Sequence, residues 1–145
     1  MMARVTLLDK FFAEQYFYNV DEAVGSRAPN RRQDVLLVQY FLKIIFDNPI
    51  AFQPRLPTLP GPPLTVDGIS GPITLRAIKT FQELCKAKGM LIATDGRVDK
   101  AESTILFLNK AYRKVRPNDF RNIANAADCP RDLASAVAFS GISMH

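Results

Sequence analysis

Residues 66–82 (VDGISGPITLRAIKTFQ) predict a tight turn that leads directly into a helix. Asp67-Gly68 is a turn dipeptide, because the aspartate side chain can bond the backbone two residues on and glycine accepts a positive φ. Gly71 can then serve as the N-cap, and Pro72 falls at the first helical position, where its missing N–H is not needed. Thr74 falls at the third position, where its hydroxyl can reach back to the N–H of the cap. The stretch therefore predicts where one helix begins.

That helix is predicted to carry one apolar stripe. Its apolar residues recur at helical spacing and are Ala77, Ile78, Phe81, Leu84 and Cys85. Gly89 is a natural stop after the last turn, because it can take the left-handed conformation that ends many helices. Since Cys85 lies on the stripe, we expect it to be a buried free thiol.

The motif resembles that of the peptidoglycan-binding-domain-like (PGBD-like) family, a small three-helix module often written DG-x-x-G-x-x-T-x-x-A-(V/I)-x-x-FQ. The matching residues are Asp67, Gly68, Gly71, Thr74, Ala77, Ile78, Phe81 and Gln82, and upstream Val38-Gln39 and Leu42 match the first helix of the family. Asp95-Gly96 repeats the first turn and fits the internal pseudo-symmetry of the family. The second G-x-x-T element is replaced by Asp99-Lys100-Ala101-Glu102, which we interpret as a capping box. The resemblance covers roughly residues 33–112.

The resemblance and the apolar periodicity together predict an all-α fold. We expect a PGBD-like three-helix module over residues 31–115, an N-terminal helical extension over 1–30 and a C-terminal helical extension over 116–145. The first extension is predicted as a helix over residues 5–24. The helix over 31–46, with Asn30 as its N-cap, is apolar almost all round and must be covered on two sides.

A long proline-rich loop separates the first two helices of the predicted module. Residues 47–65 hold six prolines, which exclude an α-helix and favour extended backbone. The loop is either a functional element or a strap over the core. After residue 117 the pattern predicts a short helix at Phe120 and Ile123, and another that begins at Asp128-Cys129-Pro130 and ends at Gly141.

The net charge and the search for targeting signals limit the partners and the cellular location that we expect. The net charge of +5 is compatible with solvated helix ends or with attraction to a polyanion such as a cell-wall polymer. We do not expect nucleic-acid binding, because the basic residues are not interleaved with a stacking platform. No stretch is long and apolar enough for a transmembrane segment, and Asp9 and Lys10 interrupt the only N-terminal apolar run, so no signal peptide is predicted. We expect a protein that is cytoplasmic as synthesised, with phage lysis or a specialised secretion route as ways to the periplasm or cell wall.

The sequence predicts no catalytic, metal or cofactor site. The only histidine is the terminal His145, and there is no CxxC motif and no His/Cys cluster. The carboxylates at Glu14, Glu22, Glu83 and Glu102 sit where a solvated helix position or a cap explains them. We therefore expect no enzyme.

The family resemblance implies a non-catalytic module that binds peptidoglycan in a shallow groove beside the two Asp-Gly turns. The candidate ligand-binding residues are Asp67, Ser70, Thr74, Arg76, Asp95 and Arg97. The alternative for Asp67 and Thr74 is a purely structural role in the turn and the cap. Arg76 and Arg97 should contribute less to holding the fold together, which makes them better candidates for ligand contact. Gln39 and Gln82 are expected to hydrogen-bond loop backbone inside the fold.

A protein-interaction or assembly component, of a phage or a secretion machine, is the alternative function. Such a protein would keep the fold without binding glycan. The missing signal peptide, the apolar helix over 31–46, the aromatic N-terminal segment and the proline-rich loop favour it.

Overall fold

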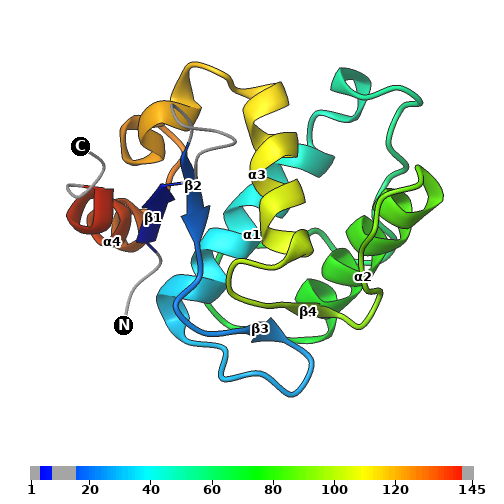
Figure 1. The fold of residues 1–145 in the computed structure, drawn as a ribbon, viewed down its shortest axis with the longest axis horizontal. Coiled ribbons are helices and arrows are strands. Elements are labelled where there is room, and N and C mark those ends of the chain that lie inside the picture. The colour runs from blue at the N-terminus through cyan, green and yellow to red at the C-terminus, as the bar shows by residue number, and fades with distance from the viewer. Residues whose placement is uncertain (1–3, 8–15, 142–145) are drawn as a thin grey trace.

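The computed structural model describes residues 4–7 and 16–141, and the side chains of residues 17–137 (Figure 1). The helices are α1 (Arg32–Phe46), α2 (Pro72–Ala87), α3 (Ser103–Val115) and α4 (Arg131–Gly141), with 3₁₀ turns η2 (Pro49–Ala51) and η3 (Asp119–Asn125). The strands are β1 (Arg4–Leu7), β2 (Tyr16–Asn19), β3 (Val24–Gly25) and β4 (Arg97–Val98). The fold is therefore largely helical, as predicted, but it is not all-α.

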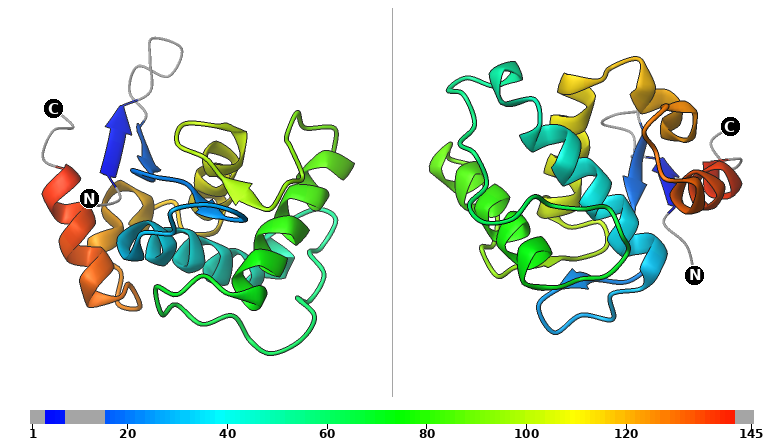
Figure 2. Two further views of the ribbon diagram at one scale, coloured as in Figure 1. Left: turned by 90° about the horizontal axis from the view of Figure 1, so that it is seen from below. Right: turned by 180° about the vertical axis from the view of Figure 1, so that it is seen from behind.

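Helix α1 lies at the centre of the molecule. Its buried residues include Val35, Leu37, Val38, Phe41 and Leu42, and both faces are covered. Helices α2 and α3 pack on one side of α1, while α4 and the strand pair β1–β2 lie on the other (Figures 1 and 2). The prediction that this helix needs cover on two sides is confirmed. Among the described residues, no helix is long and apolar enough to cross a membrane.

The helix predicted over residues 5–24 is wrong. Strands β1 and β2 pair antiparallel with Arg4 opposite Asn19, and residues 8–15 lie outside the described part of the chain. The strand places Tyr18 where its backbone N–H donates to Asn109 Oδ1 at 2.7 Å and its hydroxyl donates to the Phe120 carbonyl at 2.8 Å. Aromatic residues favour strands. A buried aromatic run therefore fits a strand held between α3 and η3 as well as it fits a helix.

Helix α2 begins and ends where predicted, but the Thr74 hydroxyl bonds Gln39 instead of reaching back to the N–H of the cap as predicted. Gly71 is its N-cap and Pro72 its first residue. At the other end Gly89 has φ +89°, the N–H of Met90 donates to the Cys85 carbonyl, and the N–H of Gly89 donates to the Lys86 carbonyl. These two bonds make a Schellman motif, which satisfies carbonyls that the helix end would leave unpaired. Cys85 is a buried free thiol, as expected, and burial raises its pKa to about 11.

Two predicted helix caps are wrong. The N-cap of α1 is Arg31, while Asn30 has φ +52° and receives the Gly25 N–H on its side-chain oxygen at 2.7 Å. Asparagine tolerates the left-handed region, so it closes the preceding loop instead. Helix α3 starts only at Ser103, because Ala101 has φ +57° and interrupts the predicted capping box.

The proline-rich loop packs on the core. Within residues 47–65 only η2 is helical, and it is a single 3₁₀ turn. Phe52, Leu56 and Leu64 are buried and belong to the hydrophobic core. The loop therefore contributes apolar surface to the fold whatever else it does.

The C-terminal segment contains the two predicted helices as η3 and α4. Asp128 connects it to the end of α3, since its two carboxylate oxygens each accept a bond from Arg116, the C-cap of α3, at 2.7 Å. The Tyr40 hydroxyl also donates to Asp128 at 2.7 Å. The Arg116 guanidinium lowers the pKa of the Asp128 carboxyl. Residues from both ends of the described chain thus share one core with α1–α3.

Candidate functional site

The first Asp-Gly turn is built around the side chain of Gln39. Gln39 is buried on α1, and its Oε1 accepts the N–H groups of Asp67 at 3.0 Å and Gly68 at 2.8 Å. Its Nε2 donates to the Ile69 carbonyl at 3.0 Å and to Thr74 Oγ1 at 2.9 Å. One amide therefore joins α1, the turn and the first turn of α2.

The second Asp-Gly turn is built in the same way around Gln82. Its Oε1 accepts the Gly96 N–H at 2.8 Å. Its Nε2 donates to the Arg97 carbonyl at 2.9 Å and to Thr104 Oγ1 at 3.1 Å. The predicted pseudo-repeat is confirmed at the level of hydrogen bonds, and so is the prediction that both glutamines bond loop backbone.

Thr104 is the residue that sequence reasoning missed. It follows Gly96 by eight residues, whereas Thr74 follows Gly68 by six, so the two threonines do not align in the motif. The order glutamine, Asp-Gly, threonine was the signal that could have found it. We call each set of a glutamine, an Asp-Gly turn and a threonine a turn unit.

Asp67 and Thr74 serve the first turn unit. The Ile69 N–H donates to Asp67 Oδ1 at 3.0 Å and lowers the pKa of this carboxyl, while Thr65 donates to Oδ2. Thr74 is buried, so its hydroxyl faces Gln39 rather than solvent. Both residues have the structural role that the sequence left open as the alternative to ligand binding.

Ser70 and Arg76 lie beside the first turn unit. Ser70 is half-buried and Arg76 is exposed. The Arg76 guanidinium lies 3.5 Å from the Pro60 carbonyl, which is a weak contact. Arg76 therefore contributes little to holding the fold together, as expected.

Arg97 is more constrained than predicted. Its Nε and Nη2 donate to Asp99 Oδ1 at 3.3 and 3.0 Å, and this pairing raises the pKa of the guanidinium. Its Nη1 donates to the carbonyls of Ser26 at 3.2 Å and Arg27 at 2.8 Å. The expectation that Arg97 contributes little to holding the fold together is wrong, since its side chain connects β4 to the loop after β3 through hydrogen bonds. Asp95 is exposed and accepts the Arg97 N–H at 3.0 Å.

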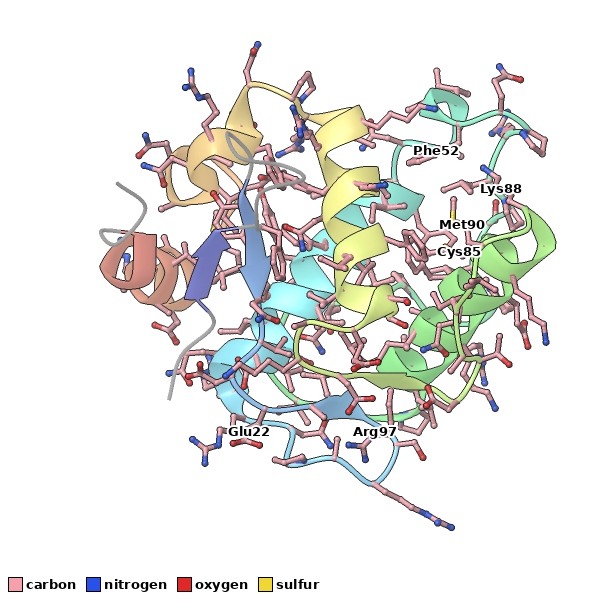
Figure 3. The ribbon with its side chains drawn as sticks, in the orientation of Figure 1. Glu22, Phe52, Cys85, Lys88, Met90 and Arg97 are labelled. Carbon is pink, nitrogen blue, oxygen red and sulfur yellow. The ribbon has the colours of Figure 1, made fainter. Side chains whose placement is uncertain are left out.

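A polar groove lies beside the second turn unit, with Glu22 and Arg97 on its walls (Figure 3). It has a volume of about 720 Å³ and is open to solvent. Its ionisable side chains are Asp21, Glu22, Asp99, Glu102, Arg97 and Lys100. The groove thus presents both carboxylates and cations. Of the six predicted ligand residues, Arg97 alone lines this polar groove, so the structure does not gather all six into one cleft.

No group of three or more His, Cys, Asp or Glu side chains that could hold a metal ion is found among the described residues. No family model, no curated protein and no solved structure matches the chain. The resemblance to the PGBD-like family consequently remains an interpretation of the motif residues.

Proposed function

We propose that the chain is a non-catalytic binding module for peptidoglycan and that the polar groove is its binding site. The observation that carries the proposal is the pair of turn units. The residues of the PGBD-like motif form one connected set of hydrogen bonds at Gln39, and the same set recurs at Gln82. The polar groove lies directly beside the second unit, since Arg97 lines the groove and its carbonyl accepts a bond from Gln82.

The chemistry of the polar groove suits a stem peptide with its sugars. Stem peptides carry amines and carboxylates, and the sugars carry hydroxyl and acetamido groups. Glu22 and Lys100 are exposed on the groove, so each can form a charge-assisted hydrogen bond with a ligand group of opposite charge. Arg97 already holds Asp99 and two backbone carbonyls, so we assign it the role of shaping the groove.

Two features that favoured an assembly component belong to the buried core of this chain. Helix α1 is apolar all round because its own neighbours cover it, and Phe17 and Tyr18 of the aromatic N-terminal segment are buried. Among the described residues, α1, Phe17 and Tyr18 therefore offer no apolar surface to a partner. These findings weigh toward the glycan-binding proposal.

Sedimentation with insoluble sacculi tests the proposal. The wild-type protein should pellet with sacculi and stay bound at moderate salt, because hydrogen bonds to hydroxyl and acetamido groups are not screened by salt as attraction between exposed charges is. Lys100→Ala and Glu22→Gln should each weaken binding by about two- to fivefold, the range expected for one exposed charged contact. Neither change should lower the melting temperature.

Arg121→Ala is the matched control, because Arg121 is an exposed cation on η3 and does not line the polar groove. It should leave pelleting unchanged. If Arg121→Ala and Lys100→Ala weaken pelleting equally, binding is nonspecific charge attraction and the groove assignment fails. Absence of pelleting, with a co-purifying protein or a stable oligomer in size exclusion, would favour the assembly component instead.

A further inference from the structure

A second pocket, which we call the apolar pocket, lies between α1, α2, α3 and the proline-rich loop. Its volume is about 170 Å³. Its apolar wall includes Ile45, Phe52, Leu56, Phe81, Leu84 and Phe107. Figure 3 shows Phe52, Cys85, Lys88 and Met90 together at this place, on a different part of the molecule from Glu22 and Arg97.

Three lysines surround the apolar pocket. The ammonium groups of Lys88 and Lys114 lie over the same ring, 5.9 and 5.6 Å from the centroid of Phe52. The ammonium group of Lys110 lies 5.9 Å from the centroid of Phe107. No acidic residue is among the described side chains that line the pocket. The rim therefore concentrates positive charge that no carboxylate of the lining offsets.

We propose that the apolar pocket binds a small hydrophobic carboxylate, with an aryl or medium-chain alkyl group inside and the carboxylate on the lysine rim. Ligand pockets generally combine an apolar lining with a few polar groups that fix orientation. An anionic head group would relieve the repulsion among the lysines, whereas a cationic one would add to it. This charge complementarity decides the class of ligand.

The size of the pocket sets the size of the apolar group. A cavity of about 150 Å³ lined by aliphatic and aromatic side chains is large enough for benzene. The apolar pocket is slightly larger, at about 170 Å³, and is not fully enclosed, and the three lysines of its lining are exposed to solvent. It can take one aromatic ring or one medium-chain alkyl group, but not the two chains of a phospholipid.

This site goes beyond the proposed function. Figure 3 places the labelled residues of the two sites apart, and they share no lining residue among those described. A ligand in the apolar pocket needs neither turn unit. Loss of sacculus binding would therefore leave the present proposal standing, and the reverse also holds.

A head-group series tests the proposal. Octanoate, 1-octanol and octyltrimethylammonium share one alkyl chain and differ in charge, and each is titrated into the full chain while chemical shifts of the pocket residues are followed by NMR. We expect the affinity to fall from octanoate to octanol to the cation. Octanol binding as tightly as octanoate, or no saturable octanoate binding, would overturn the proposal.

Lysine variants identify the groups that bind the carboxylate. Lys88→Met and Lys114→Met should each weaken octanoate binding by about two- to fivefold, as expected for one exposed ion pair, and should leave octanol binding unchanged. Lys86→Met is the matched control, because Lys86 is an exposed lysine of α2 outside the pocket lining. If Lys86→Met weakens octanoate binding as much as Lys88→Met, the lysine rim is not the site of the head group.

A filled pocket provides a test that does not depend on charge. Ala111→Leu adds bulk to α3 at a lining position that is half-buried. It should abolish binding of both octanoate and octanol while the melting temperature shows that the variant is folded. Unchanged octanoate binding in a folded Ala111→Leu variant places the ligand elsewhere and overturns the assignment. If the variant does not fold, the lysine variants still decide the question.

Discussion

Gln39 and Gln82 make equivalent hydrogen bonds at two places in the fold. The Oε1 of each accepts the N–H of a turn glycine at 2.8 Å, from Gly68 and Gly96 respectively. The Nε2 of each donates to a threonine hydroxyl in the first turn of the next helix. Each buried amide therefore joins its own helix to the following Asp-Gly turn and to the start of the next helix, so the two amides link α1 to α2 and α2 to α3.

Replacing either glutamine should destabilise the protein strongly. Gln82→Leu keeps the volume but leaves the Gly96 N–H and the Arg97 carbonyl without their partner, and a buried unpaired group costs about 1–3 kcal/mol. We expect a loss of about 3 kcal/mol in the free energy of unfolding, measured by urea denaturation. Gln39→Leu should have a similar effect, since its bonds are the same in kind.

The control for both is Gln33→Leu, a half-buried position at the start of α1. It should change stability by no more than about 0.5 kcal/mol. Equal losses of unfolding free energy in Gln33→Leu and Gln82→Leu would show that the hydrogen bonds of the turn units add no more stability than an ordinary half-buried glutamine does.

Thr104→Val tests the residue that the motif did not reveal. Removing its hydroxyl takes one acceptor from Gln82, so we expect a loss of about 1 kcal/mol. A double-mutant cycle should show coupling between Thr104→Val and Gln82→Leu, because the two side chains are in contact. Thr104→Val and Gln39→Leu should be additive, since Gln39 bonds Thr74 instead. Additivity in both cycles would contradict the assignment of Thr104 to the second turn unit.

The helices could be predicted because their signals are local. The start of α2 at Pro72 and its end before Gly89 are decided within one turn at each end. The strand β2 could not be predicted in this way. Its conformation depends on Asn109 and Phe120, which lie far along the chain, and an aromatic run alone fits either structure.

The candidate site shows the same division between local and distant contacts. The Asp-Gly turns and the two glutamines could be predicted, since the motif contains them. Thr104 was missed by the spacing of the motif, because the turn at Ala101, with φ +57°, lengthens the segment between the second turn and its helix, and only the order of residue types pointed to it. The fixed position of Arg97 also escaped prediction, because the carbonyl of Arg27 that it binds lies 70 residues earlier.

Gly25→Ala should be among the most damaging single substitutions. Gly25 has φ +112°, a region that residues with a side chain rarely adopt, and an added Cβ would overlap the carbonyl oxygen of Gly96. Because backbone cannot give way as a side chain can, the pairing of β3 with β4 would have to shift. We expect a loss of about 3 kcal/mol or more, measured by thermal and urea unfolding.

Gly71→Ala is the matched control. Gly71 has φ −134°, and nothing lies within 4 Å of the position that its Cβ would occupy. Alanine is a much poorer N-cap than glycine, so we expect a loss of about 1 kcal/mol, which is still well below that of Gly25→Ala. A Gly25→Ala variant as stable as Gly71→Ala would mean that β3 and β4 do not pair as described.

Acid should weaken the ion pair between Asp128 and Arg116 at the end of α3. Arg116 lowers the pKa of the Asp128 carboxyl, and the Tyr40 hydroxyl also donates a hydrogen bond to it. A second carboxylate, that of Asp119, lies 3.9 Å from the Arg116 guanidinium. A carboxyl whose pKa is lowered on folding contributes stability above its unfolded pKa of about 3.9. That contribution is lost as the pH falls through the lower, folded value. Because both side chains of the pair are partly exposed, it should be only about 1 kcal/mol.

Asp128→Asn isolates this contribution. The difference in unfolding free energy between wild type and variant should be constant above about pH 5 and should shrink as the pH falls below about 4. Asp132→Asn is the control, because the Arg32–Asp132 pair is more exposed, at 52% and 59% of side-chain area, and should contribute less than about 0.5 kcal/mol. Urea titrations between pH 3 and pH 7 provide the measurement. A difference for Asp128→Asn that grows toward low pH would reverse the expected sign and show that Arg116 does not stabilise the ionised carboxylate.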